Sequence, residues 1–350
     1  METKTYKSYR QLVAKLRTRG MVIGKGSQGS RVMRILEKEN YYNVINGYKE
    51  LFILTPATNA TDEVYKCGTT FDEVYALYTF DREIRNIYLK YLLKIENSLK
   101  TVIAHEFSKL YGHDNYLKLD NFQSIASTDR GQLTYIAKRN KLDIVTDIAE
   151  INRISAEENA SSVIKLIGDI HQEIARQMGK HHQVVTHYMT DHGYIPLWVL
   201  VNVLTFGKIT NFFANMKPAD KTTVARKFNV HPDELQKYMQ ILGLARNKCA
   251  HDERFYDFRS RRNIKTNSIK NISTLSLPKD NGNFVSGIND AFAVAIIISQ
   301  LLKVSDVREF VTALKGSFNR LTKELHTISV DDVMHVMGFP LGWENLTKLK

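Results

Sequence analysis

The chain has 350 residues, 43% of them apolar and 25% charged, an ordinary globular composition that excludes long disordered tracts. Its two cysteines are too few for a disulfide framework and its N-terminal residues lack the apolar core of a signal peptide, so we expect a cytoplasmic protein. The net charge is +12, and the longest apolar stretches, 194–206 and 291–302, are shorter than the roughly 20 residues that cross a bilayer, so we expect no membrane span.

Helical periodicity dominates the first third of the chain. Residues 6–19 and 30–40 are expected to form short helices on either side of a Gly- and Ser-rich loop, and one small hairpin is expected near residues 51–66. The clearest helical pattern runs over residues 71–109, where apolar residues recur three and four positions apart. Glu96 lies beside this apolar stripe, so we expect a half-buried carboxylate that needs a cation.

The rest of the chain is also mostly helical by pattern. Helices are expected at residues 135–151, 161–179, 195–216, 233–251, 289–302 and 307–325. The Ser-, Thr- and Asn-rich stretch 259–279 interrupts them and is expected to be a loop or a flexible arm. Because there is no internal repeat and no sustained strand alternation, the sequence predicts a mainly α fold.

Positive charge is concentrated in two stretches. Residues 1–40 hold ten lysines and arginines against three glutamates, and residues 258–279 hold six more and no acid, so the remainder of the chain is nearly neutral. Such clusters favour nucleic acid as the partner, ahead of a solvated basic surface kept for solubility or an anionic membrane. The candidate RNA-binding residues are Lys15, Arg17, Arg19, Lys25, Arg259, Arg261, Arg262 and Lys265.

Two apparent motifs are weak. Residues 24–29 match the G-x-G-x-x-G phosphate loop, but no full strand precedes them and the kinase motifs that would follow are missing, so a plain turn is favoured. His181, His182, His187 and His192 are close in sequence but lack the carboxylate spacing of a zinc site, so solvent-facing or hydrogen-bonded histidines are favoured. We therefore expect no metal and no cofactor.

The strongest candidate site is the segment from Arg246 to His251, in which four residues separate an arginine from a histidine. The same spacing recurs at 176–181 and 226–231, but only this copy lies on a strong predicted helix that leads into the acid-free basic stretch. At about 100° per residue, Asn247 and His251 project together from the helix, with Arg246 beside them. They lie opposite an inward stripe of Tyr238, Leu242, Ala245 and Cys249.

These three polar groups can serve RNA cleavage without a metal. A histidine can act as general acid or base near neutral pH, and an arginine can clamp a phosphate with its planar fork. The alternative is an ordinary helix end, with His251 near the C-terminal end of the helix dipole and Arg246 paired with Glu96 or Asp252. The spacing alone favours this alternative.

Several short blocks spread along the chain carry a family resemblance. They are 19–21, 40–42 with 47–48, 70–71, 78–82 with 84–85, 95–96, 195–198, 204–207, 245–255, and 337–340 with Trp343. In this order they resemble the Abi-like family of bacterial abortive-infection proteins, the AbiD and AbiF group. The resemblance implies a HEPN ribonuclease motif, in which two helical domains pair to form one composite site. Carried onto this chain, Arg246 would hold phosphate, Asn247 would orient the 2′-hydroxyl or phosphate, and His251 would be the general acid or base, with Glu96 in support.

The resemblance implies a HEPN-like helical core at residues 65–258. It would be preceded by a basic N-terminal helical segment at 1–64 and followed by a basic loop or arm at 259–283 and a helical extension at 284–350. The expected function is metal-independent endoribonuclease activity in abortive infection, as a homodimer that cuts RNA and is restrained by a small structured RNA, as in a toxin–antitoxin pair. The alternatives are a non-catalytic RNA-binding scaffold and a protein-interaction module of a defence system.

Overall fold

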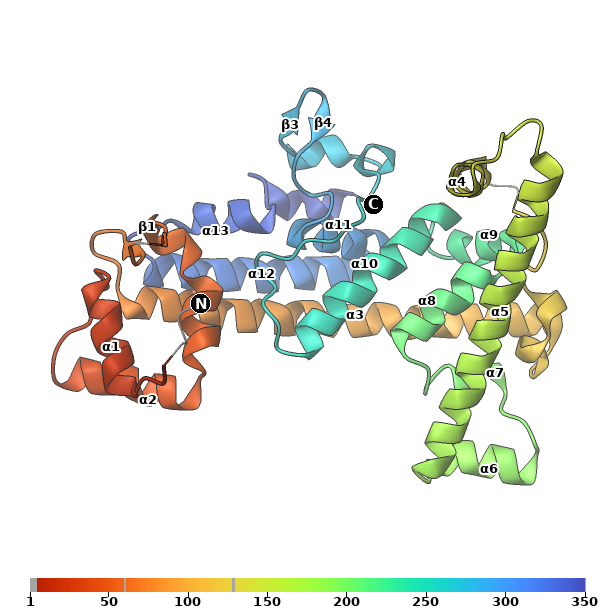
Figure 1. Ribbon diagram of the computed structural model, residues 1–350, viewed down its shortest axis with the longest axis horizontal. Helices are drawn as coiled ribbons and strands as arrows, with labels where there is room; N and C mark the ends of the chain where they lie inside the picture. The colour runs from red at the N-terminus through yellow and green to blue at the C-terminus, as the bar shows by residue number, and fades with distance from the viewer. Residues whose placement is uncertain (1–4, 60, 128–129, 350) are drawn as a thin grey trace. The chain divides into compact units, whose positions relative to one another are not determined.

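The computed structural model describes residues 5–59, 61–127 and 130–349, and within these ranges the chain is mainly α, as the sequence predicts (Figure 1). The chain forms two compact units, one made of residues 1–92 and 244–350 and the other of residues 93–243. Two helices, α3 (Phe71–Tyr111) and α10 (Pro232–Ala250), contribute residues to both units. None of the helices in the described ranges has the length and apolar character that crossing a bilayer requires.

The first unit begins with two short helices that pack on each other, α1 (Tyr9–Thr18) and α2 (Ser27–Lys38). Ser8 caps α1 because its hydroxyl accepts the N–H of Gln11, whose side chain bonds back to the Ser8 backbone. The segment that follows is made of short elements. It consists of a π-helical turn η1 (Tyr42–Asn46), a 3-10 turn η2 (Glu50–Phe52) and the predicted small hairpin, β1 (Ile53–Thr55) with β2 (Val64–Tyr65).

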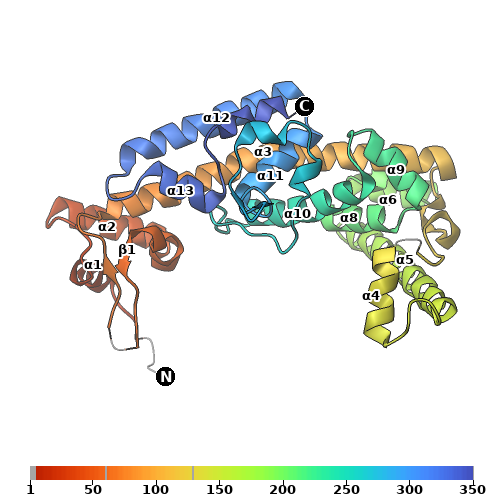
Figure 2. The ribbon, with the colours of Figure 1, turned by 90° about the horizontal axis from the view of Figure 1, so that it is seen from above.

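The core of the first unit joins the N-terminal part of α3 to the C-terminal helices (Figure 2). Helix α12 (Val304–Glu324) runs antiparallel to α3, because Phe80 packs on Phe318 and Tyr88 on Phe310, with ring centroids 5.2 and 5.1 Å apart. Nearly every side chain of α11 (Ala291–Leu301) is buried, so this helix lies inside the core. The remaining elements of the unit are α13 (Val330–Met337) and the 3-10 turn η7 (Trp343–Lys348).

The basic stretch from Arg259 onward is a loop that is tied to the first unit. Ser260 N–H donates to the Asn289 carbonyl at 2.7 Å, and Ile264 N–H donates to the Ile288 carbonyl at 2.8 Å. Its regular pieces are short: η5 (Thr266–Ser268), η6 (Ile272–Leu275), β3 (Lys279–Asp280) and β4 (Asn283–Phe284). Because Ile264 and Leu275 are buried, the apolar residues of the stretch anchor it while most of its basic residues face solvent.

The second unit is helical throughout its core. Phe107 on α3 meets Phe122 and Phe212, with centroid distances of 5.1 and 5.0 Å. Glu96 is buried, not half-buried as expected, and pairs with Lys100 at 2.9 Å, which supplies the predicted cation. The other elements are η3 (Asn115–Leu117), η4 (Leu119–Asn121), α4 (Arg130–Asn140), α5 (Ile148–Gly179), α6 (Gln183–Asp191), α7 (Leu197–Leu200), α8 (Phe206–Asn215) and α9 (Pro218–Arg226).

Four helix predictions were wrong in their boundaries. The helix expected at 135–151 is interrupted between α4 and α5, where the Asp143 carboxylate accepts the N–H groups of Val145 and Thr146. The helix expected at 195–216 is two helices, because Thr205 caps the start of α8 through its hydroxyl. Helix α2 already begins at Ser27, inside the expected loop, and the helix expected at 161–179 already begins at Ile148. In the first two cases a short polar side chain binds nearby backbone groups and competes with helix continuation, which hydrophobic periodicity does not register.

Candidate functional site

Helix α10 presents the Arg246–His251 motif on its surface. The predicted inward stripe is confirmed, since Tyr238, Leu242, Ala245 and Cys249 are all buried. Asn247 and His251 are exposed and Arg246 is partly buried. The polar groups of the motif are therefore placed on a helix whose opposite face is fixed by the core.

The helix ends at Ala250, one residue before the last residue of the motif, His251. The N–H of His251 still donates to the Asn247 carbonyl at 2.9 Å, and Asp252 then takes a left-handed conformation with φ of 57°. The N–H of Glu253 returns to the Lys248 carbonyl at 3.1 Å, the bond that closes a Schellman-type helix end. The backbone from Arg246 to His251 is thus helical, so the angular relation predicted for Asn247 and His251 applies.

The chain that leaves the motif is held by a buried carboxylate. The Asp81 carboxylate on α3 accepts the N–H of Tyr256 at 2.6 Å, the N–H of Phe255 at 3.2 Å and the hydroxyl of Tyr48 at 2.6 Å. Tyr48 also stacks on Tyr256, with ring centroids 5.4 Å apart. Burial and the neighbouring Asp81 charge raise the pKa of Tyr48, so its hydroxyl stays protonated and can donate.

A buried arginine completes this network. Arg85 lies one helical turn after Asp81, donates to the Glu253 carbonyl at 2.9 Å and pairs with Asp252 at 2.6 Å. Asp252, one of the partners considered for Arg246, is therefore engaged by Arg85. Asp81 and Arg85 together fix residues 252–256, so they determine where the helix end that carries His251 lies. Neither residue was singled out from spacing or composition, although both fall in blocks that carry the family resemblance.

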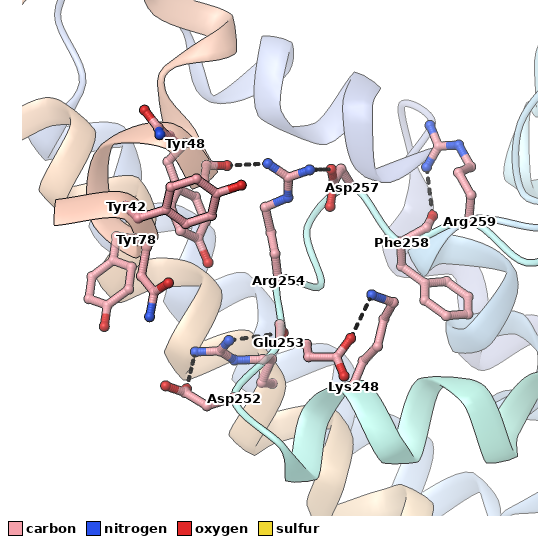
Figure 3. A pocket seen from close by; sticks show the side chains of 14 residues that line it. Tyr42, Tyr48, Tyr78, Lys248, Asp252, Glu253, Arg254, Asp257, Phe258 and Arg259 are labelled. Atoms are coloured by element: carbon pink, nitrogen blue, oxygen red, sulfur yellow. Dashed lines mark hydrogen bonds and ion pairs between the residues drawn. The ribbon is translucent and has the colours of Figure 1, made fainter. Parts of the chain in front are cut away.

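A pocket of about 550 Å³ lies against the C-terminal end of α10 (Figure 3). One wall is the segment around the π-helical turn η1, and the other is the chain that follows the motif. Lys248 pairs with Glu253 at 3.1 Å, and Arg254 pairs with Asp257 at 2.5 Å and donates to the Gly47 carbonyl at 2.6 Å. Lys248 is three residues before His251 and hence adjacent to it on the helix surface.

These pocket residues could be found from the sequence only indirectly. The tyrosine-rich run after residue 40 and the residues after His251 both carry the family resemblance, but nothing in their spacing indicates that they meet. The pocket is lined by Tyr42, Asn43, Asn46, Gly47, Tyr48, Tyr78, Arg85, Lys248, Asp252, Glu253, Arg254, Asp257, Phe258 and Arg259. Aromatic, amide and cationic groups thus face one cavity beside the motif.

Cysteine chemistry does not fit this site. Burial raises the pKa of the Cys249 thiol to about 12, and the nearby Asp81 carboxylate adds to the effect. Since the thiolate is the nucleophilic form, Cys249 is inert at neutral pH and acts as a core residue.

The basic residues after the motif differ in the contacts they make within the protein. Arg259 lines the pocket and donates to the carbonyls of Phe258 and Val336 at 2.8 and 2.9 Å, so it also holds the end of α13. Arg261, Arg262 and Lys265 are exposed. Of these four basic residues, Arg259 lines the pocket, whereas the other three have exposed side chains outside its lining.

Two of the four N-terminal candidates for RNA binding, Arg17 and Arg19, bind groups within the protein. Arg17 donates to the carbonyls of Ile23 and Gly24 at 2.9 and 2.7 Å. Arg19 is mostly buried and pairs with Asp62 and Glu63. Arg17 and Lys25 are exposed, and Lys15 is partly buried.

The glycine motif forms a turn, and His182 and His187 make local hydrogen bonds or ion pairs, as the sequence analysis favoured. Gly24 N–H donates to the Gln28 side chain at 2.7 Å at the entry to α2, which is a turn. His187 lies 2.7 Å from Asp191, and His182 caps α6. Among the described residues, no group of three or more potential metal ligands was found. Glu96 belongs to the second unit, and its supporting role toward Arg246 stays a prediction.

Comparison with known proteins identifies the family of the chain. A family model described as Abi-like protein matches residues 34–257, which is more than half of the chain. No curated protein and no solved structure matches. The matched range contains the Arg246–His251 motif, the Asp81 network and most of the residues that line the pocket.

Proposed function

Because the chain belongs to the Abi-like family, we propose that it acts in abortive infection, the phage defence for which the family is named, as a metal-independent endoribonuclease of the HEPN type. The observation that carries this proposal is the exposure of Asn247 and His251, with Arg246 beside them, on a rigid helix end bordered by cations. RNA inside the cell is the substrate class, and no cofactor is required.

The chemistry follows from the three groups. A base removes the proton of the 2′-hydroxyl, the 2′-oxygen attacks the adjacent phosphorus, and the bond from phosphorus to the 5′-oxygen breaks as an acid protonates that oxygen. His251 supplies the base or the acid, Arg246 neutralises the crowded phosphate, and Asn247 orients the hydroxyl or a phosphate oxygen. The products are a 2′,3′-cyclic phosphate and a 5′-hydroxyl.

The reaction needs a base and an acid, and a pair of identical chains supplies one histidine for each. We therefore place the active site between two copies of the chain. Leu244 is half exposed on the same side of α10 as His251, seven residues earlier, so it offers apolar surface to a second copy. A small structured RNA that restrains the enzyme would use the same basic surface.

Chelation gives the direct test of the reaction type. Cleavage of a single-stranded RNA is expected to continue in excess EDTA, because proton transfer and phosphate neutralisation come from side chains. Mass spectrometry of the fragments is expected to show cyclic phosphate and 5′-hydroxyl ends. Activity that is lost in EDTA and restored by Mg²⁺, with 5′-phosphate ends, would contradict the proposal.

The exposed arginines after the motif are expected to contribute electrostatic affinity. The double variant Arg261→Ala with Arg262→Ala should bind RNA more weakly and lower the slope of log affinity against log salt by about 0.7 per lost phosphate contact. Arg259 is left intact because it also holds α13. A matched loss of two charges, Arg308→Ala with Lys323→Ala on the exposed side of α12, is the control. Equal slopes in the two double variants would place the RNA elsewhere.

A further inference from the structure

The pocket beside the motif has a chemistry that RNA cleavage alone does not require. We propose that it binds one unstacked base of the RNA strand, next to the phosphate held by the Arg246–His251 motif, and that it sets the base at which the enzyme cuts. This inference rests on the proposed ribonuclease function, and it names the part of the substrate that the site recognises.

The first argument is an exposed aromatic ring on an unusual turn. Tyr42 is 66% exposed although it lines a pocket, and it opens the π-helical turn η1. Such turns are rare and recur at functional sites, because they displace side chains from helical positions. Single-stranded RNA is recognised through bases that stack on aromatic rings or on arginine planes, and both Tyr42 and Arg254 line this pocket (Figure 3).

The second argument is the hydrogen-bonding capacity of the same wall. Asn43 and Asn46 lie on the same π-helical turn as Tyr42 and line the pocket. Each carboxamide offers both donors and an acceptor, the combination that reads the edge of a base. At about 550 Å³ the cavity also falls in the size range of small-ligand sites.

The third argument is that the cations of the pocket can change partners. The side chains of Lys248 and Glu253 are 36% and 56% exposed, and those of Arg254 and Asp257 are 38% and 32% exposed. Ion pairs this exposed are weak, so an incoming phosphate can replace the carboxylate as the partner. A strand whose phosphate reaches Lys248 lies next to His251, which joins the pocket to the motif.

Binding measurements test the stacking role of Tyr42. The probe is a fluorescein-labelled single-stranded RNA of about ten nucleotides, titrated in a His251→Ala background to prevent cleavage. Tyr42→Ala is expected to weaken binding roughly tenfold, whereas Tyr42→Phe keeps the ring and near-native affinity. Tyr135→Ala on α4 is the matched control, because Tyr135 is 64% exposed and does not line the pocket.

Cleavage mapping tests the reading of the base. With His251 intact, Asn46→Asp replaces amide donors by acceptors and is expected to change which base borders the cut. The four nucleoside monophosphates serve as competitors, and the base that competes best is expected to be the base at the cut.

The outcomes separate this inference from the proposed function. Equal RNA affinities for Tyr42→Ala and Tyr135→Ala, with an unchanged cut site in Asn46→Asp, would overturn the base pocket while wild-type cleavage upholds the nuclease. Binding that depends on Tyr42 in a protein that never cleaves would uphold the pocket and overturn the nuclease. A third outcome would also overturn the inference. If a free nucleotide competes with RNA but Tyr42→Ala and Asn46→Asp change neither RNA affinity nor the cut site, the pocket does not bind a base of the RNA strand.

Discussion

Replacement of His251 by alanine is expected to abolish RNA cleavage while leaving the fold and the RNA affinity nearly unchanged. General acid–base catalysis by a positioned side chain contributes about 10²- to 10⁴-fold, and in the proposed composite site both proton transfers depend on this histidine. The imidazole is exposed at the end of α10, so its loss leaves no cavity in the core. Cleavage rates, circular dichroism and RNA affinity measured on the same preparation check the prediction.

The chain supplies its own control for this experiment. His231 is also exposed and also follows an arginine, Arg226, with four residues between them, but it lies outside α10 and the pocket. His231→Ala is expected to cleave at the wild-type rate. Equal rates for His251→Ala and the wild type would remove the nuclease assignment and leave a basic RNA-binding protein.

Mixing experiments extend the same variant to the proposed dimer. When wild-type and His251→Ala chains are co-expressed in equal amounts and pair at random, only dimers of two intact chains keep both histidines, so about one quarter of the activity should remain. Activity that falls to one half would instead assign a complete site to each chain.

The regular parts of this fold were predictable because their side-chain pattern matches helical periodicity. The stripe of α3 and the inward face of α10 follow the spacing of a helix with one buried side, and the structure confirms both. The errors lie where a single polar side chain decides the backbone. Asp143 and Thr205 end or begin helices through local hydrogen bonds, and hydrophobic periodicity carries no information about them.

The candidate site was predictable only along one helix. Arg246, Asn247 and His251 are close in sequence, so a helical wheel relates them without a three-dimensional structure. The pocket, in contrast, joins residues near 45 to residues near 255, and the network joins Asp81 to Tyr256. Contacts over such separations depend on the packing of whole helices, which no local pattern specifies.

This long-range network is the reason why the motif has a defined position at all. Residues 252–256 leave α10 in a left-handed turn and have no regular secondary structure of their own to hold them. Their backbone N–H and carbonyl groups are instead bound by Asp81 and Arg85, both buried on α3. A buried donor without an acceptor is costly, so this segment is tied to α3 as strongly as to its own helix.

Asp81 also forms a buried ion pair with Arg85, 3.7 Å away. Asp81→Ala is accordingly expected to destabilise the first unit by about 3–5 kcal/mol, the cost of removing one partner from such a pair. The change leaves the Phe255 and Tyr256 N–H groups and the Tyr48 hydroxyl without their acceptor. Urea unfolding followed by Trp343 fluorescence in a Trp198→Phe background reports on this unit, because Trp343 is buried within it and the chain has only two tryptophans. Glu83→Ala is the matched control: Glu83 lies two residues further along α3 and pairs with Arg320 at the surface, where an ion pair contributes at most about 1 kcal/mol. Similar unfolding midpoints for the two variants would mean that Asp81 does not hold the chain after the motif, and the position of His251 would need another cause.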